Sequence, residues 1–297
     1  MLVRYRSFSR RQFLKATVAA GLTGTAIYAG LWEPHRLSIE RVEIQMERLP
    51  PVFDGFRIVQ LSDLHYGIFT PVSLIHSAVL ASNQLNADLA VVTGDFVTLP
   101  FRKHDSKRAA MSAGPCAEIL SELRARFGVL TVLGNHDAWT DVNIVTAALQ
   151  EHRIPVLRND VSLIEQKNSR LWIAGVEDVS TGEAKIWQAV KKRPAGEATI
   201  LLAHEPDYAD EVSQYNVDLQ LSGHSHGGQV RFPVFGPLVL PALGRKYPMG
   251  LRRIGRLQLY TNRGIGMIEI PLRVNCPPEV TLFTLRSRQN VGNFKQE

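Results

Sequence analysis

The sequence predicts an α/β domain with a largely parallel sheet that helices cover on both faces. Short apolar runs recur along the chain, and stretches with a helical spacing of apolar residues lie between the first three of them. This alternation of strand and helix is typical of parallel sheets buried on both sides. The runs occupy residues 56–64, 89–96, 129–133, 171–176, 199–203 and 219–221.

The remaining elements follow from local spacing. Residues 37–46 alternate apolar and polar side chains, which predicts an outer strand, with a bulge where the alternation breaks at Glu40 and Arg41. Residues 71–86 and 117–127 have the spacing of helices. Glycine, proline and short strands dominate the end of the chain, which favours an antiparallel section there. Its strands are expected at residues 229–232, 257–261 and 280–285.

Composition is that of a globular protein whose positive charge is concentrated at one end. The 297 residues are 45% hydrophobic and 21% charged, and the net charge is +6. Residues 1–32 hold five basic residues and no acidic one, so 29 basic and 28 acidic residues remain elsewhere. A near-neutral body has no broad footprint for a phosphate backbone, and a nucleic-acid partner is not favoured. The two cysteines, Cys116 and Cys276, are too few for a disulfide framework and are expected to be separate apolar residues.

Residues 1–32 are interpreted as an export signal. Arg10 and Arg11 precede Phe13, Leu14 and Lys15, and the following seventeen residues carry no charge. This arrangement resembles a twin-arginine signal, which serves proteins that are exported already folded. A short buried helix is the alternative interpretation.

The resemblance implies the twin-arginine export machinery as a partner and a periplasmic or other extracytoplasmic location. No strong cleavage site follows, and the uncharged stretch is near the lower length limit of a membrane span. The segment is therefore either removed or kept as an anchor in the inner membrane. Residues 33–36 are predicted as a linker and residues 37–297 as one domain.

Five short polar motifs stand where apolar runs end. In open α/β sheets, ligands bind outside the carboxyl ends of the strands, so these motifs are expected to converge. The motifs are D-x-H at 63–65, G-D at 94–95, G-N-H-D at 134–137, a single His204, and G-H-x-H at 223–226. Their candidate ligands are Asp63, His65, Asp95, Asn135, His204, His224 and His226.

These residue types indicate a metal centre. Carboxylate, amide and imidazole groups without cysteine form a set that holds Mn, Fe or Zn. Side chains two residues apart on an extended segment face the same way, so Asp63 and His65 are placed to hold one ion. Seven ligands are too many for one tetrahedral ion, but they suit two divalent ions if Asp95 bridges them. Two metals about 3.5–4 Å apart clamp the attacking and leaving oxygens of an in-line displacement.

Taken singly, each motif is weak evidence, because a G-D pair usually marks a turn and a lone histidine is usually satisfied by its neighbours. The ordered set is specific, and it resembles the calcineurin-like metallophosphoesterase superfamily over nearly the whole chain. The segments 204–207 (H-E-P-D), 263–266 (R-G-I-G) and 276–282 (C-P-P-E-V-T-L) are similar to its exported, membrane-associated YkuE/YaeI-like branch.

The resemblance implies an α/β (α+β) fold of two packed mixed β-sheets flanked by helices, a four-layer α-β-β-α sandwich. It also implies a role for each motif residue. One metal would be held by Asp63, His65 and His226, the second by Asn135, His204 and His224, with Asp95 between them. His136 would act near the leaving oxygen as an acid or charge stabiliser, oriented by Asp137.

The expected function is therefore hydrolysis of a phosphate ester, with diesters favoured over monoesters, by in-line attack of a hydroxide that bridges the two metals. The export signal and the apolar stretch 232–243 indicate a lipid-linked or cell-envelope phosphoester, and a membrane surface as a partner. A nuclease on the same metal centre is one rival, and a non-catalytic metal-binding envelope protein is the other. A P-loop phosphotransferase is excluded, because G-x-x-x-x-G-K-[ST] is absent.

Three further features have a functional and a structural interpretation. Arg263 either binds a substrate phosphate or is a solvated hairpin residue. The basic stretch 99–114 either attracts an anionic substrate or is a solvated loop. The apolar stretch 232–243 either rests on a membrane or acyl chain or is buried within the domain.

Overall fold

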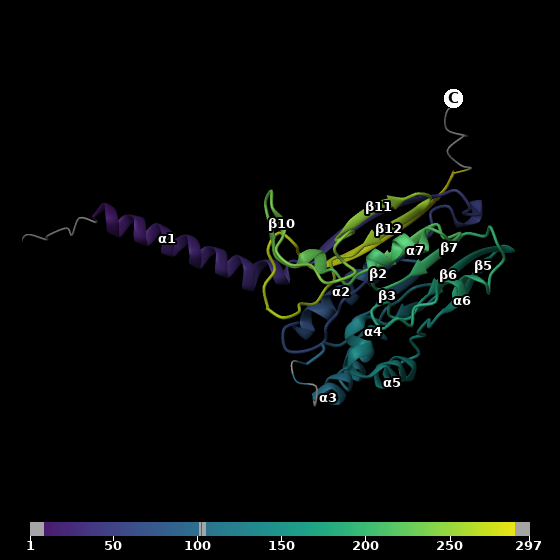
Figure 1. The fold of residues 1–297 in the computed structure, drawn as a ribbon, viewed down its shortest axis with the longest axis horizontal. Coiled ribbons are helices and arrows are strands. Elements are labelled where there is room, and N and C mark those ends of the chain that lie inside the picture. Colours follow the sequence, from purple (N-terminus) through teal and green to yellow (C-terminus); the bar gives the residue numbers. More distant parts are fainter. Residues whose placement is uncertain (1–8, 101, 103–104, 289–297) are drawn as a thin grey trace, which may run out of the picture.

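Two mixed β-sheets pack face to face at the centre of the protein, and helices cover their outer faces (Figure 1). The computed structural model describes residues 9–100, 102 and 105–288. The first sheet has the strand order β1 (Ser38–Met46), β13 (Glu279–Ser287), β2 (Arg57–Leu61), β3 (Leu89–Thr93) and β4 (Val129–Val132). The second has the order β11 (Gly250–Ile254), β12 (Leu257–Thr261), β8 (Leu219–Ser222), β7 (Thr199–Leu202), β6 (Ser169–Gly175) and β5 (Asp160–Gln166). A small hairpin consists of β9 (Arg231–Phe232) and β10 (Gly236–Pro237).

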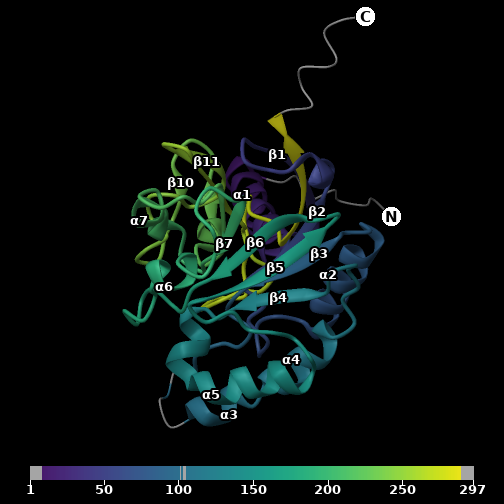
Figure 2. The same ribbon diagram turned by 90° about the vertical axis from the view of Figure 1, so that its right-hand side faces the viewer.

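Three apolar clusters join the layers. The central cluster lies between the sheets and includes Ile58 and Val91 of the first sheet and Ile200 and Leu221 of the second. A second cluster packs the outer face of the first sheet against helices, and a third does so for the second sheet (Figure 2). The helices on the first sheet are α2 (Val72–Gln84), α4 (Ala113–Leu120) and α5 (Asn135–Glu151), with α3 (Ser106–Ala110) packed on α5. Those on the second are α6 (Ile186–Val190) and α7 (Ala209–Val212). The expected architecture of two mixed sheets flanked by helices is confirmed.

The six apolar runs form the parallel strands of the two sheets. They contain β2, β3 and β4 of the first sheet and β6, β7 and β8 of the second, and the neighbours within each trio pair in parallel. The end of the chain is mixed, because β12 pairs antiparallel with β11 but parallel with β8. The strand prediction is thus confirmed, and the antiparallel expectation holds only in part.

Two local predictions are wrong. The outer strand β1 pairs with β13 residue for residue through Glu40 and Arg41, so it has no bulge there. Glu40 occupies an inward position because its carboxylate pairs with Arg263 at 2.5 Å, which explains the break in alternation. The helix expected at 117–127 begins and ends earlier, as α4. Helix α5 was not expected at all, and it begins within the G-N-H-D motif.

The N-terminal segment forms a helix that projects from the body (Figure 1). Helix α1 (Arg10–Ile27) begins with a capping box between Ser9 and Gln12, and none of its residues is buried. The alternative of a short buried helix is therefore wrong. A π-helical turn (Tyr28–Trp32) and a 3-10 turn (Glu33–His35) connect α1 to the domain, and Glu33 is buried. Among the described residues, no helix combines the length and the apolar character needed to cross a membrane.

The first eight residues, with Arg4 and Arg6 of the proposed signal, lie outside the described part of the chain. Cys116 and Cys276 are both buried and unpaired, as expected.

Candidate metal centre

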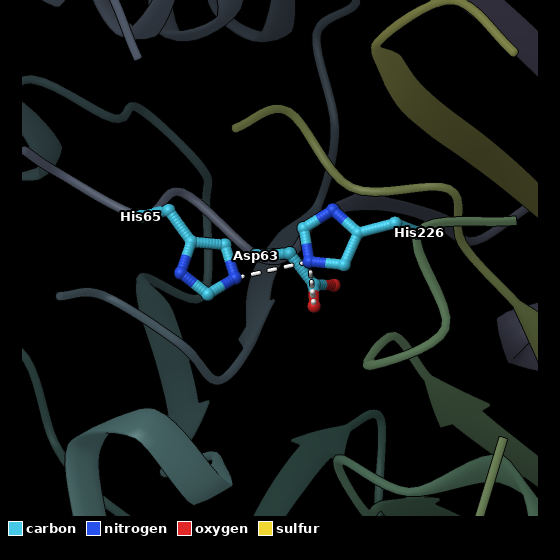
Figure 3. A group of neighbouring side chains, drawn as sticks. All are labelled: Asp63, His65 and His226. Carbon is cyan, nitrogen blue, oxygen red and sulfur yellow. Dashed lines mark hydrogen bonds and ion pairs between the residues drawn. The ribbon is translucent and has the colours of Figure 1, made fainter. Parts of the chain in front are cut away.

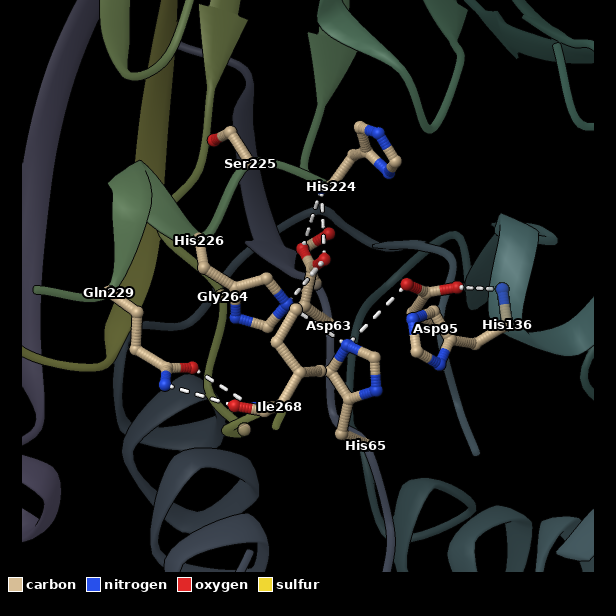
Figure 4. Close-up of polar contacts among 12 residues, drawn as sticks. Asp63, His65, Asp95, His136, His224, Ser225, His226, Gln229, Gly264 and Ile268 are labelled. Carbon is tan, nitrogen blue, oxygen red and sulfur yellow. Dashed lines mark hydrogen bonds and ion pairs between the residues drawn. The ribbon is translucent and has the colours of Figure 1, made fainter. Parts of the chain in front are cut away.

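The five polar motifs converge at one edge of the two sheets: Figure 4 shows residues of four of them together, and His204 lies 3.1 Å from Asp95. Three of them follow β2, β3 and β4 of the first sheet, and the other two follow β7 and β8 of the second. The seven predicted ligands are all buried, with at most 6% of any side chain exposed. Three overlapping groups have ligand atoms within 4.8 Å of one another, as a metal ion requires. The groups are Asp63, His65 and His226; Asp63, Asp95 and His204; and His65, Asp95 and His136.

Five of the predicted ligands have a left-handed backbone. Each such residue costs about 1–3 kcal/mol, and this strain is concentrated at functional sites. Backbone hydrogen bonds between the strand ends maintain it, for example from His65 N to Asp95 O at 3.0 Å. The φ values are 50° at Asp63, 45° at His65, 56° at Asp95, 68° at His224 and 50° at His226.

The first group brings two histidine rings against one carboxylate (Figure 3). The Nε2 atoms of His65 and His226 are 3.0 Å apart, and His226 Nε2 is 3.4 Å from Asp63 Oδ1. Burial lowers the pKa of both rings well below the usual value, so both are neutral at pH 7. Two neutral ring nitrogens and a carboxylate oxygen directed at one point are a suitable donor set for a cation.

His204 presents a nitrogen to the Asp95 carboxylate. Its Nδ1 lies 2.6 Å from the backbone oxygen of Thr93 and donates to it, an arrangement that orients metal-binding histidines. Its Nε2 is 3.1 Å from Asp95 Oδ2 but makes no well-oriented hydrogen bond within the described residues. Burial opposes protonation, yet the charge of Asp95 outweighs it and holds the pKa of His204 well above the usual value. A positive charge is therefore favoured between these two groups.

His224 and Asn135 show the same need for a cation. His224 Nδ1 is 2.8 Å from Asn135 Oδ1, and its Nε2 is 2.7 Å from the backbone oxygen of Ala242. Burial lowers the pKa of His224 to about 4, so the ring is neutral and has one N–H for two acceptor oxygens. The ring can donate to only one of the two oxygens, so its other nitrogen keeps a lone pair that a metal ion could accept. Asn135 and His224 thus suit a shared metal ion.

Asp95 lies between the two sets of ligands. Its Oδ2 is 3.4 Å from His65 Nε2 and 3.1 Å from His204 Nε2, while its Oδ1 accepts the backbone N–H of His136 at 2.8 Å. Burial disfavours the charged carboxylate, but His204 and His136 hold the pKa of Asp95 well below its usual range. Asp95 thus lies against one predicted ligand of each set, His65 and His204.

The prediction that Asp137 orients His136 is wrong. The backbone N–H of Leu99 donates to His136 Nδ1 at 2.9 Å, so Nδ1 carries no proton and Nε2 does. The Asp137 carboxylate instead accepts backbone N–H groups around the G-D turn, which holds Asp95 in place. These donors are Asp95, Phe96, Val97 and Gly134. The role of Leu99 cannot be predicted from the sequence, because its backbone N–H makes the contact and its side chain does not.

Two glycines are required by close packing at the centre. A Cβ atom on Gly223 would lie 2.2 Å from Asp63 Oδ2, and one on Gly134 would lie 2.3 Å from Asp95 Oδ1. Both distances are too short for any other residue, so these glycines allow the strand ends to approach one another.

Arg263 is not available to bind a substrate phosphate. Its guanidinium pairs with Glu279 and Glu40 at 2.5 Å each, and this explains both the burial of the side chain and the inward position of Glu40. Another arginine, Arg273, was missed in the sequence. It is fully buried and donates to the backbone oxygens of Gly264 and Gly266, in the loop that packs behind Asp63. In the sequence, the only indication that Arg273 is buried is its place within an apolar stretch bounded by prolines.

A cavity of about 850 Å³ opens beside His136. Its apolar lining includes Ile68, Phe69 and Trp139, and two cations of the basic stretch, Arg102 and Arg108, also line it. Lys103 and His104 of the same stretch lie outside the described residues.

A four-layer fold with carboxylate, amide and imidazole side chains at the carboxyl ends of its strands is the arrangement expected of a metallophosphoesterase. Residues 56–228, more than half of the chain, match the family model for calcineurin-like phosphoesterases, and the chain belongs to this family.

Two relatives match nearly the whole chain. The metallophosphoesterase YkuE of Bacillus subtilis is 35% identical over 95% of this chain and 99% of its own length. The phosphodiesterase YaeI of Escherichia coli is 32% identical over 93% of this chain and 99% of its own. The solved structure of Haemophilus influenzae NAD nucleotidase aligns with a TM-score of 0.46 at 16% identity, over 71% of this chain and 45% of that one.

Proposed function

We propose that the protein is a phosphodiesterase that uses two divalent metal ions, Mn, Fe or Zn, and hydrolyses a lipid-linked or other cell-envelope phosphoester. The observation that carries this proposal is the crowding of buried carboxylate and imidazole groups, all of them possible metal ligands, at one point. His65, His226, Asp95 and His204 face one another at 3.0–3.4 Å, an arrangement that is favourable around cations. We assign Asp63, His65 and His226 to one ion and Asn135, His204 and His224 to the other, with Asp95 shared.

When bound, the ions would stabilise negative charge on the phosphoryl oxygens and lower the pKa of water, so that hydroxide would be available as the nucleophile at neutral pH. The chain itself positions the other groups. The Leu99 N–H fixes the His136 tautomer, so Nε2–H is the donor available for charge that develops on the leaving oxygen. This geometry favours charge stabilisation by His136 over transfer of a proton from an imidazolium. The apolar cavity beside His136 would hold the organic group of the ester.

A diester is favoured over a monoester for two reasons. The similar protein YaeI is named a phosphodiesterase. The cavity next to His136 also offers space for a second organic group on the phosphate.

The test uses the full chain, stripped of metal and then supplied with Mn²⁺, Fe²⁺ or Zn²⁺. We expect no turnover of bis(p-nitrophenyl) phosphate without metal, restored turnover with it, and slower turnover of p-nitrophenyl phosphate. Two bound metals without turnover of either substrate would favour a non-catalytic metal-binding protein. Cleavage of DNA with a steep salt dependence, faster than cleavage of the diester, would favour the nuclease.

We also propose export through the twin-arginine machinery to the periplasmic or extracytoplasmic side. Support comes from the pair Arg10 and Arg11 at the start of α1, a helix whose side chains are exposed. Changing both arginines to lysine preserves the charge but is expected to keep the protein in the cytoplasmic fraction. Lys15→Arg serves as the control and should be exported normally. Unchanged export of the double variant would contradict the proposal.

A further inference from the structure

The edge that carries the metal centre also exposes large apolar side chains. In the loop between β9 and β10, Val234 is 101% exposed and Phe235 88%. Leu238 and Val239, just after β10, are 63% and 67% exposed. Burial of this stretch, one of the two interpretations of the sequence, is therefore wrong for these side chains. Single exposed apolar residues are ordinary, but a contiguous group marks an interaction surface. We call residues 232–239 the apolar hairpin.

The apolar hairpin is continuous with the turn Tyr28–Trp32 that follows α1, which we call the base of α1. Arg231 N donates to Val274 O at 2.9 Å, and Arg273 N donates to Ala29 O at 2.9 Å. The segment 268–275 thus joins the hairpin to the turn after α1, and Figure 1 shows the three side by side. Along this surface, Ile270 is 44% exposed, Leu31 68% and Trp32 65%.

Strand topology places this surface at the metal centre. Strand β1 runs parallel to β13, and β13 runs antiparallel to β2. The start of β1, to which α1 is connected, therefore lies at the edge where β2 ends and Asp63 follows. The hairpin is connected to the same site through Gln229, which follows His226 by three residues. The Gln229 side chain donates to Ile268 O, as Figure 4 shows, and also to Ile270 O.

The charge pattern identifies the occupant. Residues 232–244 carry no charge, and Arg231 and Arg245 flank them. The uncharged stretch 16–32 at the other end of the surface follows Arg10, Arg11 and Lys15. Apolar tips bordered by cations suit a lipid bilayer, in which acyl chains accept the tip and phosphate headgroups attract the basic residues.

We propose that the apolar hairpin and the base of α1 dock on a lipid bilayer, with Val234 and Phe235 inserted below the headgroups and the metal centre facing the membrane. The docking does not depend on the proposed function. Its consequence, that a lipid-borne phosphoester reaches the metal centre at the level of the headgroups, rests on that function.

The test places an environment-sensitive fluorophore on the hairpin of the full chain. Both native cysteines are fully buried, so Phe235→Cys provides a selective labelling site for a nitrobenzoxadiazole probe. The vesicles contain phosphatidylcholine and phosphatidylglycerol, with or without bromine on the acyl chains. We expect a blue shift of the emission on vesicle addition and quenching by the brominated lipid. The matched control is Leu163→Cys on β5, which is 41% exposed at the far side of the molecule and should show neither change (Figure 1).

Three results would overturn the proposal. The first is unchanged emission from position 235 while the protein sediments with the vesicles, because α1 alone would then hold it. The second is failure to bind the vesicles. The third is a blue shift without vesicles that grows with protein concentration, which would make a second copy of the chain the occupant. Turnover of the soluble chromogenic diester by the labelled variants is measured separately, so failure of docking and failure of the phosphodiesterase function are distinguishable.

Discussion

Asp95→Asn is expected to weaken the binding of both metal ions together. Asparagine preserves the shape of the side chain and the acceptor for His136 N–H, but it removes the negative charge between His65 and His204. Loss of a group that only orients a ligand costs about 10–100-fold in metal affinity, so loss of a shared ligand should cost at least about 100-fold. Turnover should fall roughly 1000-fold or more, because metal charge contributes several kcal/mol and each 1.36 kcal/mol is a factor of ten.

Elemental analysis of the purified variant and calorimetric titration with Mn²⁺ measure this effect. The control is Asp218→Asn, which changes a buried carboxylate that accepts Thr199 N–H and pairs with Arg48, away from the metal ligands. This variant should bind both ions as the unmodified chain does. If Asp95→Asn lost one ion and kept the other at full affinity, Asp95 would belong to one site and would not bridge the two.

His136→Gln is expected to reduce turnover by about 100- to 1000-fold while leaving the metal content unchanged, because it removes one hydrogen-bond donor to the charge that develops on the leaving oxygen. The Nε2–H of His136 is directed by Leu99 N–H, and the ring lies 4.6 Å from that of His65, centroid to centroid. The loss should be greatest for diesters with an alkyl leaving group, which need the most stabilisation as the bond breaks. It should be smallest for a p-nitrophenyl leaving group, which departs readily without help.

The measurement compares kcat for a series of diesters with leaving groups of different pKa, together with metal content. His152→Gln, at the other end of α5, is the control and should behave as the unmodified chain. An equal loss for all leaving groups would indicate a structural role for His136. Loss of one ion would make His136 a ligand, as its group with His65 and Asp95 also permits.

Much of the fold was predictable because its strands are buried. A parallel strand covered on both faces consists almost entirely of apolar residues, so β3 and β7 stand out in the sequence. Helix α5 was missed because its first turn carries the polar G-N-H-D motif. These residues belong to the candidate metal centre, so the start of the helix lacks the apolar spacing that predicts a helix. The bulge in β1 was wrongly predicted because the partner of Glu40, Arg263, is 223 residues away.

The sequence by itself determined the class of chemistry. The identities and order of the ligands, from Asp63 to His226, restrict the centre to a hard or borderline metal, and their positions after apolar runs predict that they converge. Residue types, their order and their positions after apolar runs can all be read directly from the sequence.

Only the tertiary structure decided which group each polar residue contacts. In the folded protein, the Leu99 amide determines the tautomer of His136, and Asp137 accepts hydrogen bonds from the backbone around Asp95. Arg263 forms ion pairs with two carboxylates. The tertiary structure also placed the apolar hairpin beside the base of α1, at the edge that holds the metal centre. Each of these contacts joins segments distant in sequence or uses a backbone group. The reason is physical, since distances and hydrogen-bond directions are set by packing of the two sheets, and no single stretch of sequence specifies them.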